Sequence, residues 1–505
     1  MRATYTCFGF FVVFFLLANC GNEEKNSGEV IARRYCGSCH QFPQPAVLDK
    51  ITWEKKVLPK MGAMLGIDSY NDQYLTTIDQ TDIGKKNGSI DFNDWGKIVQ
   101  YYISQAPHKL PLQKRSSIKA HTNRFAVKES SIKTSNPATS FARIDPGNQL
   151  IYVGTMSDSS VLVFDKNLEL IMKHKVKNLP VHLTFEDDMA MPGDRIGVLT
   201  SIGTFYPNNQ ETGRVESFNF NKQGKIIQLS LVADSLPRPV QTTILDIDKD
   251  GLNDYLVCGF GNESGSFFYL HKKTTHRFEK KLIRSQPGAI NSFVEDLNDD
   301  KLPDLITLFA QGDEGIYLFT NKGNGDFETT RILIFPPVYG STYFEMQDVN
   351  GDGLKDIIYT CGDNFDYSRI LKNYHGVYIF VNKGGHHFEQ EYFFPINGCY
   401  KAIARDFDKD GDVDLATISY FPDVKTQPEE SFVYLENSGK LHFTPFTIQQ
   451  YHRGRWITMD AADIDSDGDD DIVIGSLIPK DNNQPATTNQ EPDKPSFLFL
   501  ENLTR

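Results

Sequence analysis

From residue 124 onward the chain alternates short apolar stretches with polar turns, which is the pattern of consecutive β-strands. Seven stretches rich in aromatic and β-branched residues mark one hairpin each, at residues 161–164, 217–220, 267–270, 316–319, 377–380, 432–435 and 497–500. Six continue through a turn into another strand, whereas the seventh is closely followed by the last residue, Arg505. Segment 124–129 suits the missing strand, and we predict that it pairs with the last hairpin and closes a ring.

A nine-residue loop repeats between these hairpins and indicates the architecture. It begins at Asp246, Asp296, Asp348, Asp406 and Asp463, at intervals of 50, 52, 58 and 57 residues, and each copy precedes a short apolar strand. Repeats of this length are typical of propellers and solenoids. Together with the seven hairpins, they predict an all-β seven-bladed propeller over residues 124–505.

The repeated loop has the form Asp-x-Asp-x-Asp-Gly-x-x-Asp. Side-chain oxygens at positions 1, 3, 5 and 9, with a backbone carbonyl at position 7, form the oxygen-rich shell that Ca²⁺ prefers, and glycine at position 6 permits the tight reversal. Plain Asp-Gly turns are the alternative interpretation. For up to five Ca²⁺ ions, the predicted side-chain ligands are Asp246, Asp248, Asp250, Asp254, Asp296, Asn298, Asp300, Asp304, Asp348, Asn350, Asp352, Asp356, Asp406, Asp408, Asp410, Asp414, Asp463, Asp465, Asp467 and Asp471.

These loops resemble the calcium-binding FG-GAP, or VCBS, repeats of integrin α-subunit propellers and of many secreted bacterial proteins. The resemblance covers residues 124–505 and is strongest from Asp246 onward. It implies that the ions stiffen the turns and take no part in catalysis. The second loop departs from the pattern because Lys301 stands at the glycine position. The first two blades have turns with few carboxylates, at 145–148 and 191–194, and are expected to bind no calcium.

The region before the propeller has a helical pattern. Apolar residues at 95, 98, 99, 102 and 103 predict a helix from about residue 94 to 104, with Asn93 as its N-cap. A proline at 107 ends it, and a polar, aperiodic stretch follows. The chain is therefore divided into a signal peptide (1–19), a tether (20–28), a small all-α domain (29–110), a linker (111–123) and the propeller.

The small domain contains the sequence Cys-Gly-Ser-Cys-His at residues 36–40. In this spacing two thiols add to the haem vinyl groups and the histidine becomes an iron ligand. The motif resembles that of cytochrome c domains, which implies covalent haem c on Cys36 and Cys39, His40 as one axial ligand and a methionine as the other. Met61, just after a Leu-Pro pair, is the preferred methionine, and Met64 is the alternative. A zinc site or a redox dithiol is the competing interpretation.

The amino terminus predicts export. One basic residue, Arg2, precedes an apolar run from 8 to 18 that is short for a membrane span and fits a signal peptide. The run ends in Leu-Ala-Asn-Cys, which resembles a bacterial lipobox and implies lipidation of Cys20; an ordinary cleaved signal is the alternative. We expect an exported lipoprotein, held by its lipid on the periplasmic side or the cell surface of a Gram-negative bacterium.

Composition narrows the class of protein and its partners. The 505 residues are 39% hydrophobic and 23% charged, which excludes a collagenous, coiled-coil or wholly disordered chain. The formal net charge is −14, whereas a nucleic-acid binder normally has a basic excess, so no nucleic-acid partner is expected. The cysteines outside the motifs, Cys258, Cys361 and Cys399, cannot all pair, so at least one free thiol is expected.

Departures from the repeat indicate a second possible site. The fifth blade carries a polar, aromatic insertion at residues 361–368, and further polar loops lie at 311–314 in the fourth blade and at 452–456 before the last aspartate loop. Loops at one end of a propeller surround its central channel, where they can bind a ligand; ordinary solvated loops are the alternative. Asp363, Asp366, His375 and Arg455 are the candidate catalytic residues, since they offer acid, base and anion-binding chemistry.

Three functions fit these features. The leading hypothesis is a lipid-anchored electron-transfer protein, in which the haem exchanges one electron and the propeller recognises a redox partner protein or a small-molecule ligand. The second is an oxidoreductase whose substrate binds at the top of the propeller while the haem removes electrons. The third is a non-enzymatic binding or adhesion protein, which leaves the haem motif without a use.

Overall fold

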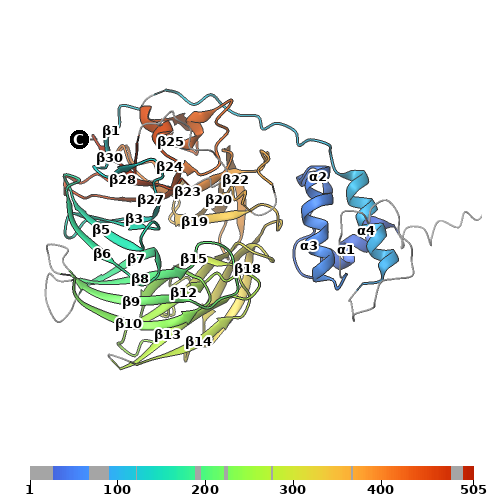
Figure 1. The fold of residues 1–505 in the computed structure, drawn as a ribbon, viewed down its shortest axis with the longest axis horizontal. Coiled ribbons are helices and arrows are strands. Elements are labelled where there is room, and N and C mark those ends of the chain that lie inside the picture. The colour runs from blue at the N-terminus through green and yellow to red at the C-terminus, as the bar shows by residue number, and fades with distance from the viewer. Residues whose placement is uncertain are drawn as a thin grey trace, which may run out of the picture.

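The computed structural model describes residues 27–67, 90–120, 122–187, 195–220, 226–274, 277–365, 368–478 and 493–504. A helical module lies beside a larger ring of β-sheets, and an extended segment joins the two (Figure 1). The predicted signal peptide, Cys20 and Asp366 lie outside the described residues. Within the described part of the chain, no helix combines the length and the apolar character that crossing a membrane requires.

The helical module packs around a small aromatic core. Its helices are α1 (Gly28–Cys36), α2 (Lys50–Thr52), α3 (Leu58–Met64) and α4 (Phe92–Gln105), and the π-helical turn Trp53–Val57 joins α2 to α3. Trp53 and Tyr102 meet at a ring-centroid distance of 4.3 Å, and Trp95 is also buried. The start predicted for the last helix was wrong: α4 begins at Phe92, because Asp91 is the N-cap and its side chain accepts the Asn93 N–H at 2.8 Å.

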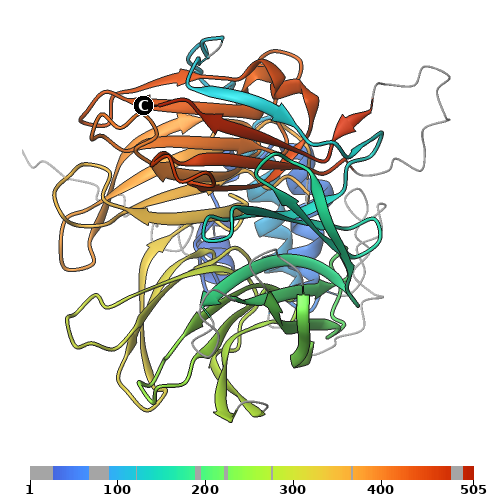
Figure 2. The ribbon, with the colours of Figure 1, turned by 90° about the vertical axis from the view of Figure 1, so that its left-hand side faces the viewer.

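Seven four-stranded antiparallel sheets form the ring, which confirms the predicted seven-bladed propeller (Figure 2). The first three blades are β3–β6 (Thr139–Asp145, Leu150–Thr155, Ser160–Asp165, Leu170–Lys175), β7–β10 (Leu179–Asp187, Arg195–Gly203, Gly213–Phe220, Ile226–Leu236) and β11–β14 (Pro239–Leu245, Asp254–Gly259, Ser266–Thr274, Arg277–Arg284). The next three are β15–β18 (Ala289–Glu295, Asp304–Phe309, Gly315–Asn321, Phe327–Ile334), β19–β22 (Ser341–Gln347, Asp356–Cys361, Gly376–Asn382, Phe388–Pro395) and β23–β26 (Cys399–Arg405, Asp414–Ser419, Phe432–Asn437, Phe443–Phe446).

The seventh blade joins the two ends of the ring. It consists of β27 (Trp456–Ala462), β28 (Asp471–Ser476), β30 (Phe497–Asn502) and β1 (Phe125–Glu129), in the order β1-β30-β28-β27. The strand β1 runs antiparallel to β30, with Val127 opposite Leu500. The predicted closure by segment 124–129 is therefore confirmed. A short additional pair, β2 (Lys133–Thr134) with β29 (Lys494–Pro495), lies beside this blade.

Burial explains why the strands differ in sequence. All six residues of β16 are buried, because a middle strand of a blade packs on neighbouring blades through both faces. The outermost strand β18 is largely exposed and correspondingly polar. The apolar stretches that mark the hairpins are the third strands of the blades. In the seventh blade this third strand is β30.

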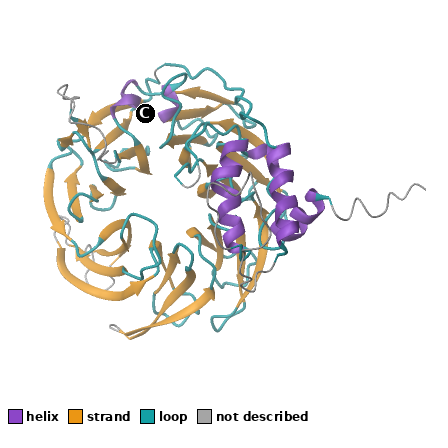
Figure 3. Cartoon of the chain, turned by 45° about the vertical axis from the view of Figure 1, so that its right-hand side comes forward, coloured by secondary structure: helices purple, strands orange, loops and turns teal. Residues whose placement is uncertain are grey.

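The two faces of the ring carry different loops. In each blade the first two strands are joined on one face, where the aspartate loops lie. The turns from the third to the fourth strand lie on this same face, whereas the connections from the second to the third strand and from one blade to the next lie on the opposite face. On that opposite face the helical module contacts the propeller (Figure 3). Val338 packs into the core of the helical module, and Gln113 Nε2 donates to the carbonyl oxygen of His375 at 2.7 Å.

Candidate functional site: metal loops, haem motif and channel

All five aspartate loops have the same backbone conformation. The first aspartate accepts the backbone N–H of position 5 at 3.1–3.2 Å through one oxygen, and the N–H of position 6 at 2.8–3.0 Å through the other. Position 6 has a positive φ in every loop, from 69° at Lys301 to 98° at Gly411. The second loop therefore folds like the others, although a lysine in this region is strained where glycine is not.

The ninth aspartate ties each loop to its blade. These residues, Asp254, Asp304, Asp356, Asp414 and Asp471, are at most 2% exposed. Each accepts, at 2.7–2.8 Å, a backbone N–H from the end of the third strand. Burial raises the pKa of Asp414 and that of Asp471 to about 7. Such a buried carboxylate is stabilised in its charged form by a cation close by.

The donor set fits a hard cation. Among the described residues, possible ligand atoms lie within 4.8 Å of one another in each of three groups. They are Asp248 and Asp250 of the first loop with His271 of β13, Asp406, Asp408 and Asp414 of the fourth loop, and Asp463, Asp465 and Asp467 of the fifth. In addition, one oxygen of Asp248 and one of Asp465 are buried without a hydrogen-bond partner in the described chain. Both residues stand at position 3, where a calcium ion would satisfy these oxygens.

Two residues near the loops were missed by the sequence analysis. His271, on β13, lies beside the first loop, with Nδ1 at 3.1 Å from Asp254. Asp469 follows the glycine of the fifth loop and is 4% exposed, and neither carboxylate oxygen has a hydrogen-bond partner among the described residues. Burial and the neighbouring carboxylates raise its pKa to about 6. The repeat pattern could have indicated Asp469, because the first three loops have leucine there.

The first blade differs as expected from its sequence. Asp145 is buried and forms an ion pair with Arg195 of the second blade, so an arginine neutralises this carboxylate. The turn predicted at 191–194 in the second blade lies outside the described residues.

The haem motif lies at the end of α1. Cys36 ends this helix and is half-buried, Cys39 is exposed, and both thiols are free. His40 Nδ1 lies 2.9 Å from the carbonyl oxygen of Gln41. If Nδ1 donates this hydrogen bond, Nε2 keeps its lone pair for a metal, which is the usual orientation of a ligating histidine. The residues therefore fit covalent haem.

The two candidate methionines differ in their surroundings. Met61 is half-buried and packs against the core of the helical module, whereas the Met64 side chain is 64% exposed. Both lie on α3, and Lys60 of the same helix lines the central cavity of the propeller. The segment 68–89 lies outside the described residues.

The central channel is a cavity of about 960 Å³ to which the innermost strands of all seven blades contribute. Its mouth, on the side of the helical module, is aromatic and includes Phe205, Tyr206 and Phe365. Two ion pairs lie deeper, Arg143 with Asp460 at 3.0 Å and Arg405 with Glu345 at 2.6 Å. The volume is in the range of small-molecule sites.

The candidate catalytic residues occupy different places. Asp363 lines the channel mouth. His375 is fully buried beside Tyr374 and outside the channel lining, and burial holds its pKa well below the usual range. The Arg455 guanidinium lies 4.3 Å from the ring centre of Tyr420, and its Nε donates to the carbonyl oxygen of that residue at 2.9 Å. Among the candidates with described positions, Asp363 alone lines the cavity.

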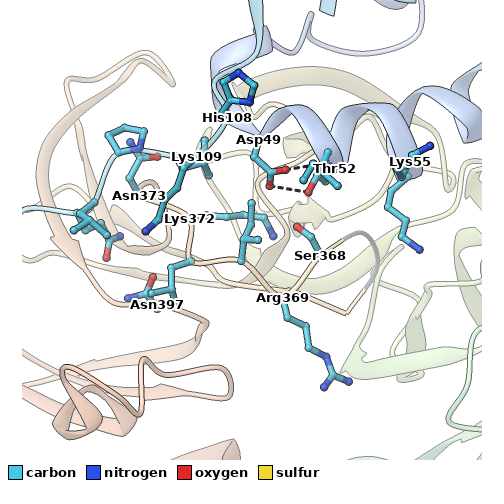
Figure 4. Close-up of a pocket in the computed structure, with 18 of the residues that line it drawn as sticks. Asp49, Thr52, Lys55, His108, Lys109, Ser368, Arg369, Lys372, Asn373 and Asn397 are labelled. Carbon is cyan, nitrogen blue, oxygen red and sulfur yellow. Dashed lines mark hydrogen bonds between the residues drawn. The ribbon is translucent and has the colours of Figure 1, made fainter. Parts of the chain in front are cut away.

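A second cavity, of about 730 Å³, lies between the helical module and the propeller (Figure 4). Asp49, Thr52 and His108 line it on one side, and Arg369 and Lys372 of the fifth blade line it on the other. The Asp49 carboxylate caps the start of α2, where it accepts hydrogen bonds from the Thr52 N–H at 2.9 Å and the Thr52 hydroxyl at 2.8 Å. This cavity is a feature of the contact between the two parts.

The segment that joins the two parts is held on the sixth blade. Arg115 forms ion pairs with two buried carboxylates, with Asp423 at 2.7 Å and with Glu430 at 3.3 Å. Farther along, the Lys119 N–H donates to the Pro445 carbonyl oxygen at 2.9 Å. These contacts fix the segment against the propeller, although it contains no helix.

Comparison with known proteins agrees with the blade architecture. Residues 296–359 match the FG-GAP-like repeat. The propeller carries FG-GAP repeats. The T-cell immunomodulatory protein homolog of Plasmodium falciparum (isolate 3D7) is 24% identical over 247 residues, and the match covers 44% of this chain and 33% of that protein. The chain thus spans about a third of the length of this curated relative.

Several solved structures are similar to the FG-GAP propeller. They include a streptogramin B lyase (11% identity, 75% of this chain, 98% of that chain, TM-score 0.44) and the Neurospora crassa Pan2 WD40 domain (9% identity, 76% of this chain, 99% of that chain, TM-score 0.44). A third is BBS1N in complex with ARL6DN (10% identity, 76% of this chain, 98% of that chain, TM-score 0.42).

One buried acid of the FG-GAP propeller makes stability depend on pH. Glu314, immediately before β17, is 3% exposed and accepts hydrogen bonds from the Ser341 hydroxyl at 2.6 Å and the Ser341 N–H at 3.2 Å. Burial raises its pKa to about 8. The folded state therefore retains a proton that the unfolded chain has lost, and Glu314 reduces the free energy of unfolding as pH rises from about 4.5 to 8.

The variant Glu314→Gln is expected to keep its free energy of unfolding as pH rises, because glutamine does not ionise. Urea unfolding should show equal stabilities near pH 4 and a growing advantage of the variant, reaching roughly 5 kcal/mol at pH 9, since each unit of pKa shift corresponds to about 1.4 kcal/mol. Glu211→Gln, at an exposed position, is the control and should follow the wild type at every pH. A constant difference between Glu314→Gln and wild type would contradict the prediction.

Proposed function

We propose that this protein is an exported, lipid-anchored electron-transfer protein, in which a c-type haem domain serves a calcium-stabilised propeller that recognises a ligand or a redox partner protein. The anchor is the lipid on Cys20, on the periplasmic side or at the cell surface of a Gram-negative bacterium. Cys36 and Cys39 hold the haem c, and His40 and Met61, with Met64 as the alternative, are the axial ligands. Haem c supplies a one-electron redox centre.

The observation that carries this proposal is the position of the helical module. The module that holds Cys36, Cys39 and His40 contacts the face of the propeller where the channel opens. Lys60 lines the channel cavity and precedes the candidate ligand Met61. A redox centre in this module is thereby next to the place where a propeller binds its ligand.

The chain's own residues have separate tasks in this proposal. The Gln41 carbonyl oxygen orients His40 by accepting from Nδ1. Arg115 keeps the module near the propeller, because it holds the joining segment to Asp423 and Glu430. The carboxylates of the aspartate loops bind calcium on the far face and stiffen the turns between the first two strands of five blades.

The test is the visible spectrum of the purified protein. We expect a reducible c-type haem spectrum that survives denaturation, because the haem is covalently bound. The double variant Cys36→Ala, Cys39→Ala should lose all covalent haem, whereas Cys258→Ala, which removes a buried thiol from the propeller, should retain it. Absence of a reducible spectrum in the wild type would overturn the electron-transfer proposal and leave a binding function alone.

The channel favours a second candidate function, an oxidoreductase. Its cavity of about 960 Å³ accommodates a small substrate, and Lys60 of the helical module contributes to its lining. Reduction of the haem by a substrate, lost on Asp363→Asn, would support this activity. If none of a broad set of small molecules reduces the haem, the protein is an electron carrier that receives electrons from another protein.

A further inference from the structure

The lining of the channel contains more basic than acidic residues. Five basic and three acidic residues line the cavity, namely Lys60, Arg143, Arg238, Lys401 and Arg405 against Glu345, Asp363 and Asp460. Two of the three acids, Glu345 and Asp460, form ion pairs with arginines. The lining therefore has two more basic than acidic residues.

The two deep acids, Asp460 and Glu345, are hydrogen-bonded within the protein. Asp460 accepts from Arg143 through Oδ1 and from the backbone N–H of Ile144 through Oδ2, at 3.0 and 2.8 Å. Glu345 accepts from Arg405 at 2.6 Å and from the backbone N–H of Ala404 at 3.0 Å. Each carboxylate thus links the innermost strands of two blades and has one arginine as its counter-ion.

Among the described residues, Lys401 has no such partner. Its ammonium lies 4.6 Å from the ring centre of Tyr343, and no described carboxylate lies within the 4.0 Å that defines an ion pair. Burial lowers the pKa of Lys401, although the charges of Asp460 and Glu345 act in the opposite direction. A desolvated, unpaired ammonium favours binding of an anion.

His182 lies in the same part of the channel. Its Nδ1 is buried, and no hydrogen-bond partner is present among the described residues. Burial lowers its pKa to about 3, and the charges of Arg143 and Lys401 act in the same direction. The ring is therefore neutral and has one N–H to donate, without adding a second positive charge.

The mouth of the channel differs from its middle. Phe205 and Phe365 are in edge contact at a centroid distance of 6.4 Å, and Phe365 is 42% exposed. Tyr206 lies next to them and is 76% exposed. Exposed aromatic rings at a cavity entrance pack on apolar parts of a ligand.

We propose that the channel binds a small monocarboxylate with an apolar or aromatic body, its carboxylate contacting Lys401 and His182 and its body lying among the aromatic rings of the mouth. Lys401 and His182 supply one ammonium and one neutral donor, which match the single negative charge of a carboxylate. This inference rests on the ligand site of the proposed function and is independent of haem.

Phenylacetate is the probe, and phenylacetamide is its uncharged analogue. In calorimetric titrations of the full-length, calcium-loaded protein, phenylacetate should bind, and phenylacetamide should bind at least about tenfold more weakly. The inference is overturned if acid and amide bind equally, if neither binds, or if inorganic phosphate binds as tightly as phenylacetate. This comparison uses the wild-type protein and is independent of any variant's folding.

A pair of variants then locates the site. Lys401→Met should weaken phenylacetate binding by about tenfold or more. Lys280→Met is the matched control, because the Lys280 ammonium also lies over an aromatic ring, 4.3 Å from the centre of Phe268, but on an outer strand. Equal binding by both variants would overturn the assignment. The same titration of the Cys36→Ala, Cys39→Ala protein should give the wild-type affinity, so that loss of haem and loss of anion binding are distinguished.

Discussion

Removal of calcium by chelation is expected to lower the unfolding temperature of the propeller by on the order of 10 °C. Each occupied site contributes about 2.7 kcal/mol when free calcium is about 100 times its dissociation constant. In the apo protein, clusters such as Asp463, Asp465 and Asp467 bring carboxylate oxygens within 4.8 Å of one another. Their mutual repulsion adds to the loss. Calorimetric scans with excess calcium and with EDTA measure the effect.

Two variants check that the loops cause this shift. Asp410→Asn, at position 5 of the fourth loop, is expected to reduce the calcium-dependent part of the stability, by about one site's contribution. Asp326→Asn, in an exposed hairpin turn outside the loops, should leave it unchanged. An unfolding temperature that is the same with calcium and with EDTA would show that the five loops are plain turns.

Shortening Phe125 is expected to destabilise the ring at its closure. Phe125 is 6% exposed and meets the rings of Phe407 and Tyr434 edge-on, at centroid distances of 5.9 and 5.5 Å. Truncation of a buried phenylalanine to alanine costs about 3 to 5 kcal/mol, so Phe125→Ala should show this loss in urea unfolding. The β1 strand also covers the edge of β30, so weaker attachment should raise the hydrogen exchange of β30 amides such as that of Leu500.

Tyr206→Ala provides the comparison for this variant. Its side chain is 76% exposed, so the loss of an aromatic ring there should change the free energy of unfolding by less than about 0.5 kcal/mol. If Phe125→Ala unfolds at the urea concentration of the wild type, the first strand contributes little to the seventh blade, and the ring is held closed by other contacts.

The architecture could be predicted because the blades repeat short sequence patterns that are continuous along the chain. Third strands such as 316–319 are buried on both faces and must be apolar, so they stand out in a chain of otherwise alternating polarity. The aspartate loops are continuous in sequence, and all their oxygens come from nine neighbouring residues. The closing strand could be inferred because one hairpin lacked a partner and one strand-like segment was left over.

The channel could not be predicted in the same way. Lys401 and His182 come from the innermost strands of the sixth and second blades, and only the closed ring brings them to one cavity. His375 looked like a site residue because it follows a polar insertion, yet its side chain points into the protein interior. The helix cap was misplaced by two residues because aspartate and asparagine are both good N-caps and the pattern of apolar positions does not distinguish them.

The seventh blade has a consequence for the order of folding. It pairs β1, at residues 125–129, with β30, at residues 497–502, so its ladder joins segments more than 360 residues apart. A ribosome makes the amino-terminal strand long before its partner exists, and until then the sheet edge that will receive it is absent. Contacts this distant in sequence slow folding, and the partial ring has open edges that can pair with other chains. The chain is thus most prone to aggregation before β30 has been made, and a chaperone that keeps it unfolded until then would favour correct closure.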